Sequence, residues 1–244
     1  MPYSRGREKS RSFDDIMAEV QRLVDEGYTE ITLLGMNVNS WGLEKVGIGV
    51  RKMMMNKDFN REDLPSNQSQ YITPEGVPPF VKLLQAISEF DEITKIRFMS
   101  SNPWDFHDDL VAEIGRNKKI DRFVHLPVQS GSNSVLHRMN RGYTRERYLD
   151  VVSKLRAADP NIVIGTDIVV GFPGETDEEF AETVDLAKQA NWKVGFIAMY
   201  SPRPGTASWK LYEDDVPHKV KKARWETLDK IINKDNLDNR PVVI

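Results

Sequence analysis

The sequence predicts an α/β fold in which parallel strands alternate with helices, as an α/β barrel or an open parallel sheet. Three observations support this prediction. Apolar residues recur at helical spacing in six segments, a short run rich in β-branched or aromatic residues follows five of them, and glycine, proline and polar residues separate the runs. Helices between consecutive strands are the crossover connections that parallel pairing requires.

The first helix is expected from Phe13 to Val24, with its apolar positions on one face. Ser12 is the expected N-cap, Asp15 follows three residues later, and Gly27 ends the helix. The run 30–34 is the strand that follows. Because an α/β barrel ordinarily begins with a strand, this order predicts that one strand is missing before the first helix.

The same unit recurs four times along the chain. The expected helices lie around residues 80–87, 106–114, 148–155 and 177–187, and the strands that follow them occupy 95–99, 123–126, 162–170 and 194–199. Thr176 and Glu179 form a capping box for the last of these helices, and Pro217 opens a final helix. Residues 42–76 have no clear period and are predicted to form a long polar loop.

Composition excludes several functions. The chain has 244 residues, a net charge of −3 and no cysteine, so disulfides and thiolate-bound zinc or iron–sulfur clusters are excluded within it. Its four histidines lack metal-ligand spacing, and no metal site is predicted. Basic residues cluster around 5–11, 138–147 and 219–224. Neither a membrane helix nor a signal peptide is visible, and a cytoplasmic location is expected.

The loops that follow the predicted strands carry the candidate ligand-binding residues. They are rich in glycine and neutral polar side chains, and comprise residues 35–39, 100–103, 127–132, 171–176 and 200–206. Such loops meet at one end of a parallel sheet, so we expect a polar ligand there. Asp167 lies in an apolar strand, which is costly unless its carboxylate is paired or binds a ligand. His125 and the five tryptophans are expected to pack in the core or at its rim.

Six motifs in the chain resemble the methylthiotransferase family of radical S-adenosylmethionine enzymes. They are PYSRGREKSR (2–11), LLGMNVN (33–39), HLPVQSGSN (125–133), RMNRGYT (138–144), TDIVVGFPGET (166–176) and YSPRPGT (200–206). They follow the family's order and span nearly the whole chain apart from residues 42–76. The branch that methylthiolates N6-isopentenyladenosine next to the tRNA anticodon resembles this chain most.

The resemblance implies a partial (β/α)6 barrel, TIM-like, that binds S-adenosylmethionine beside a [4Fe–4S] cluster. In the family, three cysteines of a C-x3-C-x2-C loop after the first strand hold this cluster. Cleavage of the cofactor gives a 5′-deoxyadenosyl radical that abstracts the C2 hydrogen of adenine. In the family, a second iron–sulfur cluster in an N-terminal domain takes part in sulfur delivery, and a small β domain that binds RNA follows the barrel. The implied partner is tRNA, through its anticodon stem-loop, and no membrane is implied.

The resemblance also assigns residues by position. The cofactor-binding set places Leu34, Gly35 and Met36 at the amino group, Ser101 and Gln129 at the carboxylate or ribose, and Asp167, Ile168 and Gly171 in the strand and loop that line the adenine. The set facing the cluster edge or the RNA comprises Arg5, Arg7, Asn37, Asn39, Arg141 and Arg203. No catalytic side chain and no metal ligand is assigned within the chain.

The motifs predict a barrel over residues 1–211 that lacks its first strand, followed by a C-terminal helix and the start of an RNA-binding β domain over 212–244. The family's cysteines lie upstream of the segment that matches Pro2–Arg7. This chain alone is therefore predicted to be inactive, and its parent enzyme to be a tRNA methylthiotransferase. Two alternatives stay open. One is a non-catalytic remnant or RNA- or partner-binding fragment, and the other is an enzyme that methylthiolates a ribosomal protein.

Overall fold

The computed structural model describes residues 9–43 and 77–235. Arg5, Arg7 and nearly all of the loop expected over 42–76 lie outside the described residues. The chain divides into two compact units, which are presented separately. The first unit comprises residues 2–124 and 154–160, and the second comprises 125–153 and 161–244. None of the described helices is both long and apolar enough to cross a bilayer.

The first unit contains a two-stranded parallel sheet with helices around it. Its elements are α2 (Phe13–Asp25), β1 (Glu30–Leu33), η1 (Val38–Ser40), α4 (Pro79–Ser88), β2 (Lys95–Phe98), η4 (Pro103–Asp105) and α5 (Asp108–Arg116). Ile31 of β1 pairs with Ile96 of β2. Ser12 caps α2 as expected, since its Oγ accepts a hydrogen bond from the Asp15 amide at 3.2 Å.

The second unit contains the longer strands. Its elements are α6 (Asn133–Arg138), α7 (Arg145–Ala158, whose last turn belongs to the first unit), β4 (Val163–Val170), α8 (Asp177–Ala190), β5 (Val194–Met199), α9 (Ala207–Leu211), α10 (His218–Asp229) and η5 (Lys230–Lys234). The sheet has the strand order β3-β4-β5. Strand β3 spans Phe123–His125, and only His125 of this strand belongs to the second unit. Strands β4 and β5 run parallel, with Asp167 opposite Phe196.

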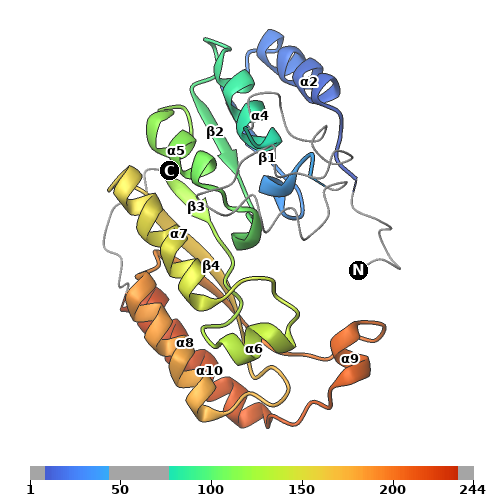
Figure 1. Cartoon of the computed structure of the whole chain (residues 1–244), viewed down its shortest axis with the longest axis vertical. Coiled ribbons are helices and arrows are strands. Elements are labelled where there is room, and N and C mark those ends of the chain that lie inside the picture. The colour runs from blue at the N-terminus through green and yellow to red at the C-terminus, as the bar shows by residue number, and fades with distance from the viewer. Residues whose placement is uncertain (1–8, 44–76, 236–244) are drawn as a thin grey trace, which may run out of the picture. The chain divides into compact units, whose positions relative to one another are not determined.

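Two helices of the second unit, α8 and α10, lie side by side (Figure 1). Helix α10 also packs on β5, where the Trp225 indole donates to the Ile197 carbonyl at 2.8 Å. Gly195 of β5 lies against η5, since a Cβ there would lie 3.1 Å from the Ile232 side chain. Phe196 of β5 is 55% exposed.

The helices and strands expected from periodicity are confirmed within one to three residues at most ends, and the Thr176–Glu179 capping box is present. Two short helices, α6 and α9, are too short to show a period in the sequence. The helix expected from residue 106 begins instead at Asp108, because the Asn102 side chain caps the 3-10 turn Pro103–Asp105 that carries Phe106 into the core.

Candidate functional site

In the first unit, the loops after β1 and β2 are joined by a pair of amide hydrogen bonds. The Asn39 Nδ2 donates to the Asn102 carbonyl at 2.9 Å, and the Asn102 amide donates to the Asn39 Oδ1 at 2.6 Å. Nearby, Ser40 Oγ donates to Asp105 Oδ2 at 2.5 Å. Asn39 is 1% exposed, so its amide holds the two loops together rather than facing solvent.

The residues that directly follow β1 are open to solvent. Leu34 is 77% exposed and Met36 63% exposed, and Gly35 and Asn37 are exposed as well. Asn37 has a φ of 53°, a left-handed conformation that asparagine tolerates better than most residues. The loop therefore presents backbone and apolar side chains at the carboxyl end of β1, where the sequence predicted a cofactor-binding segment.

The loop after β2 contains a polar atom without a partner. Ser101 is 1% exposed, and its Oγ forms no hydrogen bond with any described residue. A buried hydroxyl without a partner costs about 1–3 kcal/mol. Ser100, just before it, has a left-handed φ of 62°. The Ser101 hydroxyl therefore lacks a protein partner, follows a strained residue and lies just after a parallel strand. These three features are typical of a group that hydrogen-bonds to a ligand.

In the second unit, Gln129 is locked against β4. Its amide donates to the Asp167 carbonyl at 2.8 Å, and its carbonyl accepts from the Val169 amide at 2.9 Å. Gln129 has a φ of 72°, so its main chain is also left-handed. These bonds bring together Gln129, Asp167 and Ile168, three of the residues assigned to the cofactor, and Ile168 is fully buried.

The Asp167 carboxylate has a partner that the sequence did not predict. His125 Nε2 lies 2.9 Å from Asp167 Oδ1, and the His125 ring meets the Phe196 ring edge to face at a centroid distance of 5.8 Å. The histidine side chain is 6% exposed and the aspartate side chain 38% exposed. One carboxylate oxygen is thus held by the histidine, and the side chain remains open to a ligand.

Two buried tyrosines hold the main chain that leads to Gln129. Tyr148 donates to the Leu126 carbonyl at 2.9 Å and accepts from the Trp192 indole at 2.8 Å. Tyr143 donates to the Val128 carbonyl at 3.0 Å, and burial raises the pKa of its phenol to about 12. The Tyr143 phenol therefore stays protonated as a donor throughout the physiological pH range.

The loop after β4 is fixed by a buried ionic network. Gly171 has a φ of 68°, and a Cβ there would lie 2.3 Å from the Lys221 side chain, so this position needs glycine. Its amide donates to Glu175 Oε2 at 2.6 Å, and Arg224 binds the same oxygen at 2.8 Å. Burial raises the pKa of the Glu175 carboxyl, although the Gly171 amide and Arg224 oppose the shift. Helix α10 thus sets the conformation of the predicted adenine-lining loop.

The predicted RNA-contacting arginines of the second unit, Arg141 and Arg203, are both exposed. Their neighbour Arg138 differs, because it forms a two-point ion pair with Glu179 at 2.7 and 2.9 Å. This guanidinium lowers the pKa of the Glu179 carboxyl to about 2. Arg138 is therefore structural, whereas Arg141 and Arg203 present their charge at the surface.

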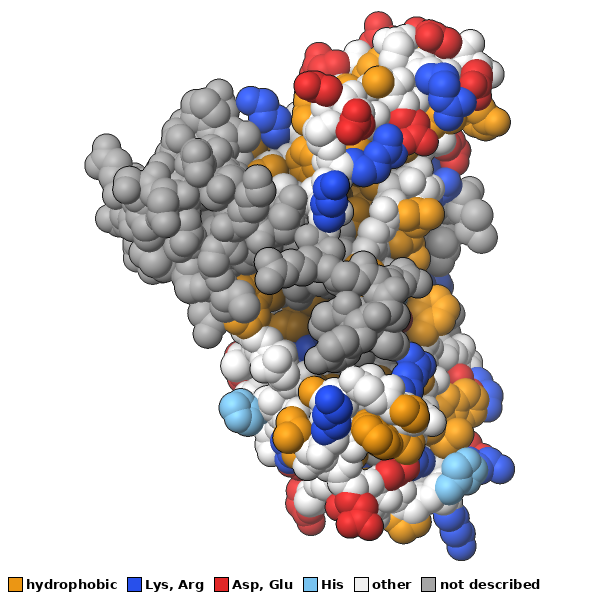
Figure 2. Space-filling view, turned by 90° about the vertical axis from the view of Figure 1, so that its right-hand side faces the viewer, with side chains coloured by type: hydrophobic (Ala, Val, Ile, Leu, Met, Phe, Trp, Pro, Cys, Tyr) orange, Lys and Arg blue, Asp and Glu red, His pale blue; other side chains and the backbone are white. Residues whose placement is uncertain are grey.

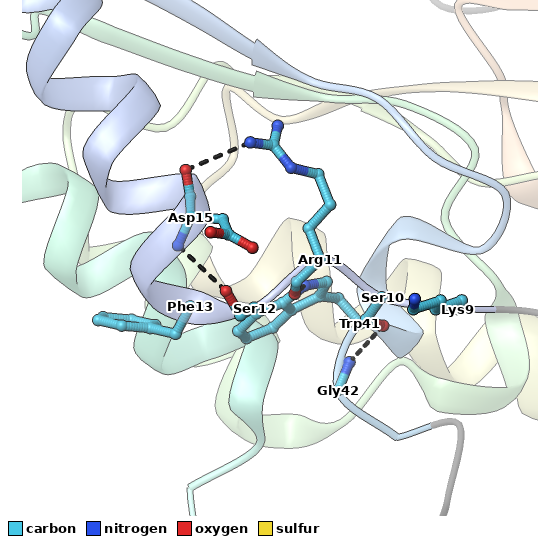
Figure 3. Close-up of a pocket in the computed structure, with 8 residues that line it drawn as sticks. All are labelled: Lys9, Ser10, Arg11, Ser12, Phe13, Asp15, Trp41 and Gly42. Carbon is cyan, nitrogen blue, oxygen red and sulfur yellow. Dashed lines mark hydrogen bonds between the residues drawn. The ribbon is translucent and has the colours of Figure 1, made fainter.

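A pocket of ≈ 600 Å³ lies beside the N-terminal segment of the first unit (Figure 3). Its lining residues are Lys9, Ser10, Arg11, Ser12, Phe13, Asp15, Trp41 and Gly42. The Trp41 indole donates to the Arg11 carbonyl at 3.0 Å, and the Gly42 amide donates to Ser10 Oγ at 3.0 Å. Arg11 pairs with Glu19, which leaves Lys9 as the free cation among these lining residues.

Each unit by itself offers groups that fit S-adenosylmethionine. The Ser101 hydroxyl in the first unit, and the Asp167 carboxylate with the Gly171 loop in the second, supply donors and acceptors for an amino-acid zwitterion or a ribose. A [4Fe–4S] cluster does not fit the residues of this chain, because the sequence has no thiolate. Among the described residues, no three histidine, aspartate or glutamate side chains gather as a metal site.

The family model of the Radical SAM superfamily matches residues 1–187. This chain belongs to the radical SAM superfamily. Among individual proteins, it is similar to the tRNA-2-methylthio-N(6)-dimethylallyladenosine synthase of Thermotoga petrophila, with 42% identity over 93% of this chain and 45% of the relative. The synthase of the same name from Clostridium botulinum, strain Langeland, is 42% identical over 96% of this chain and 45% of the relative. The chain thus spans about half the length of the relatives it matches.

Two solved structures share the fold. Coproporphyrinogen III oxidase from Escherichia coli matches with a TM-score of 0.51, 18% identity and coverage of 68% of this chain and 38% of the other. Streptococcus suis SuiB, solved bound to S-adenosylmethionine, matches with a TM-score of 0.50, 13% identity and coverage of 95% and 43%. The predicted partial barrel and the resemblance to the methylthiotransferases are confirmed.

Proposed function

We propose that this chain is the S-adenosylmethionine-binding barrel of a tRNA methylthiotransferase that adds a methylthio group to C2 of N6-isopentenyladenosine near the anticodon. The observation that carries the proposal is the 42% identity, over 93–98% of the chain, to relatives that are all tRNA-2-methylthio-N(6)-dimethylallyladenosine synthases. The order of the six loop motifs supports the same reaction. The parent protein would act in the cytoplasm on the anticodon stem-loop, with residues 212–244 leading into an RNA-binding β domain.

Within this proposal, the chain's own residues bind and orient the cofactor. In the parent enzyme, S-adenosylmethionine would supply a 5′-deoxyadenosyl radical after one-electron reduction by a [4Fe–4S] cluster, which this chain has no thiolate to hold. In the first unit, the main chain of Leu34, Gly35 and Met36 would meet its amino group, and the Ser101 hydroxyl its carboxylate or ribose. In the second unit, Gln129 and Asp167 would accept from the ribose, and the main chain of Ile168 and Gly171 would line the adenine.

The RNA-facing residues are proposed to be Arg5, Arg7, Asn37, Arg141 and Arg203. The exposure of Asn37, Arg141 and Arg203 supports this set. Asn39 is proposed to position Asn37, because it holds the loop after β1 in place. Cations at these places would contact phosphates, and such contacts supply a large share of nucleic-acid affinity. The chain by itself, without cysteine, is proposed to bind but not to react.

Binding of an anticodon stem-loop RNA tests the tRNA proposal against the ribosomal-protein alternative. A fluorescein-labelled stem-loop that carries N6-isopentenyladenosine is titrated with the 244-residue chain, and the same RNA with an unmodified adenosine is the matched control. The proposal predicts tighter binding of the isopentenylated RNA. Equal binding of both RNAs, or binding of neither, would count against a tRNA adenosine as the substrate of this barrel.

A further inference from the structure

The segment between β5 and α10 exposes an aromatic side chain between cations. We call residues 201–211 the 201–211 arm. Trp209 is 49% exposed and Leu211 71% exposed, whereas Trp192 of the same unit is fully buried. Arg203 and Lys210 of the arm are exposed as well. Trp209 therefore does not pack in the core, and its exposure calls for an explanation.

The two ends of the arm are anchored to the loop after β4. The Phe172 ring packs edge to face against Tyr200 at 5.1 Å and against Tyr212 at 5.8 Å, measured between centroids. Phe172 itself is 6% exposed. Lys221 donates to the Tyr200 carbonyl at 3.1 Å. One buried ring thus joins both ends of the arm, which makes the arm a fixed projection rather than a loose loop.

Inside the arm, the Thr206 hydroxyl joins the main chain of Arg203 to that of Trp209. Thr206 Oγ1 donates to the Arg203 carbonyl at 2.7 Å and accepts from the Trp209 amide at 3.3 Å, as the N-cap of α9. Gly205 makes the turn with a φ of 84°. Arg203 and Trp209 are therefore held on the same short turn, six positions apart in the sequence.

The two cationic side chains of the arm form no ion pair with a described residue, whereas charged side chains next to the arm have partners. Among the described residues, neither the Arg203 guanidinium nor the Lys210 ammonium forms an ion pair. Lys221, beyond the arm, is paired with Asp214 at 2.5 Å. The Asp215 carboxylate accepts from the Gly174 amide at 2.7 Å. In Figure 2, basic and hydrophobic side chains lie next to one another in the lower part of the surface, the region where Figure 1 places α9.

We propose that the 201–211 arm binds an unpaired stretch of RNA, with a base stacked on Trp209 and adjacent phosphates on Arg203 and Lys210. Fixed aromatic faces beside unpaired cations are the means by which proteins hold single-stranded nucleic acid. An apolar partner surface would not account for Arg203 and Lys210, the two exposed cations of the same arm. The inference rests on the proposed function in one respect, namely that the ligand of this barrel is RNA.

Fluorescence titration of the 244-residue chain with a short labelled oligoadenylate tests the proposal. Trp209→Ala is expected to weaken binding by about tenfold, in the range that stacking of one base supports. Trp209→Phe keeps an aromatic face and is expected to restore most of the affinity while removing the indole emission that RNA quenches. Arg203→Ala and Lys210→Ala should each lower the slope of log affinity against log salt by about 0.7.

The matched controls are Tyr28→Ala, an exposed aromatic residue of the first unit, and Lys222→Ala, an exposed cation of α10. Both should bind RNA like the unchanged chain. If the unchanged chain binds the isopentenylated stem-loop selectively but Trp209→Ala binds oligoadenylate equally well, the arm proposal fails and the tRNA function stands. If the unchanged chain binds no RNA, both fail. Self-association in light scattering that Trp209→Ala abolishes, without RNA binding, would show a protein-binding surface instead.

Discussion

His125 Nε2 and Asp167 Oδ1 lie 2.9 Å apart, and this contact joins the end of β3 to the middle of β4. A main-chain hydrogen bond sets the alignment of β3 with β4 that brings the two side chains together: the Leu126 amide donates to the Gly165 carbonyl at 2.8 Å. The pair accounts for a carboxylate in an otherwise apolar strand. It also fixes the Asp167 side chain in one orientation, as a ligand-binding acceptor requires.

Replacement of His125 by alanine should destabilise the chain. The change removes a buried ring and its hydrogen bond to Asp167, so we expect a loss of about 1–3 kcal/mol in the free energy of unfolding. Urea denaturation followed by circular dichroism measures it. His137→Ala, at an exposed position of α6, is the control and should change little. Equal stabilities of the two variants would show that the pair does not support the fold.

The Arg138–Glu179 ion pair predicts a pH dependence. Because the pKa of Glu179 is lowered to about 2 in the folded chain, the folded state favours the ionised carboxylate. Its contribution is therefore fully present above the usual carboxyl pKa of about 4.3 and is lost as the pH falls toward about 2. Glu179→Gln should lower the free energy of unfolding by on the order of 2 kcal/mol at neutral pH, and the stability of this variant should fall less steeply as the pH is lowered.

Thermal unfolding at several pH values measures this difference, with Glu178→Gln as the neighbouring exposed control. Glu179 also completes the capping box of α8, but glutamine can fill that role, so the comparison isolates the charge. Parallel acid curves for the unchanged chain and Glu179→Gln would contradict the assignment of the ion pair.

Local features of this fold were predictable from the sequence, and contacts between distant segments were not. The Ser12 and Thr176 caps depend on residues three positions apart, so a short motif specifies each. The cost of a carboxylate in an apolar strand indicated that Asp167 needs a partner, but only the strand register identifies His125. The Glu175–Arg224 pair spans 49 positions and leaves no local pattern. The exposure of Trp209 likewise follows from the turn at Thr206, which periodicity does not reveal.

The chain is expected to hold no iron–sulfur cluster. Reconstitution with iron and sulfide under anaerobic conditions should leave it colourless after desalting, because thiolates hold such clusters and this sequence has none. The Thermotoga petrophila relative, treated in the same way, is the positive control. Stoichiometric [4Fe–4S] absorbance in the desalted chain would overturn this expectation.

Binding of S-adenosylmethionine should be weak and should depend on Ser101. Without iron to chelate the amino-acid end, hydrogen bonds of about 0.5–1.5 kcal/mol each remain, so we expect a dissociation constant of roughly millimolar or worse. Ser101→Ala should weaken saturation-transfer signals from the cofactor without lowering stability, since its hydroxyl has no partner among the described residues. Ser153→Ala, at an exposed position, is the control. Micromolar binding, or no effect of Ser101→Ala, would contradict the proposed cofactor contacts.

The most direct measurement uses a chimera. The matching segment of the Thermotoga petrophila relative is replaced by this chain, the relative's own segments on either side are kept, and the chimera is expressed in bacteria that lack their own enzyme. Circular dichroism and iron content show whether the chimera is folded and loaded. We predict that mass spectrometry of digested tRNA detects 2-methylthio-N6-isopentenyladenosine. A folded, iron-loaded chimera that leaves the tRNA adenosine unmodified would contradict the claim that this chain is a tRNA methylthiotransferase barrel.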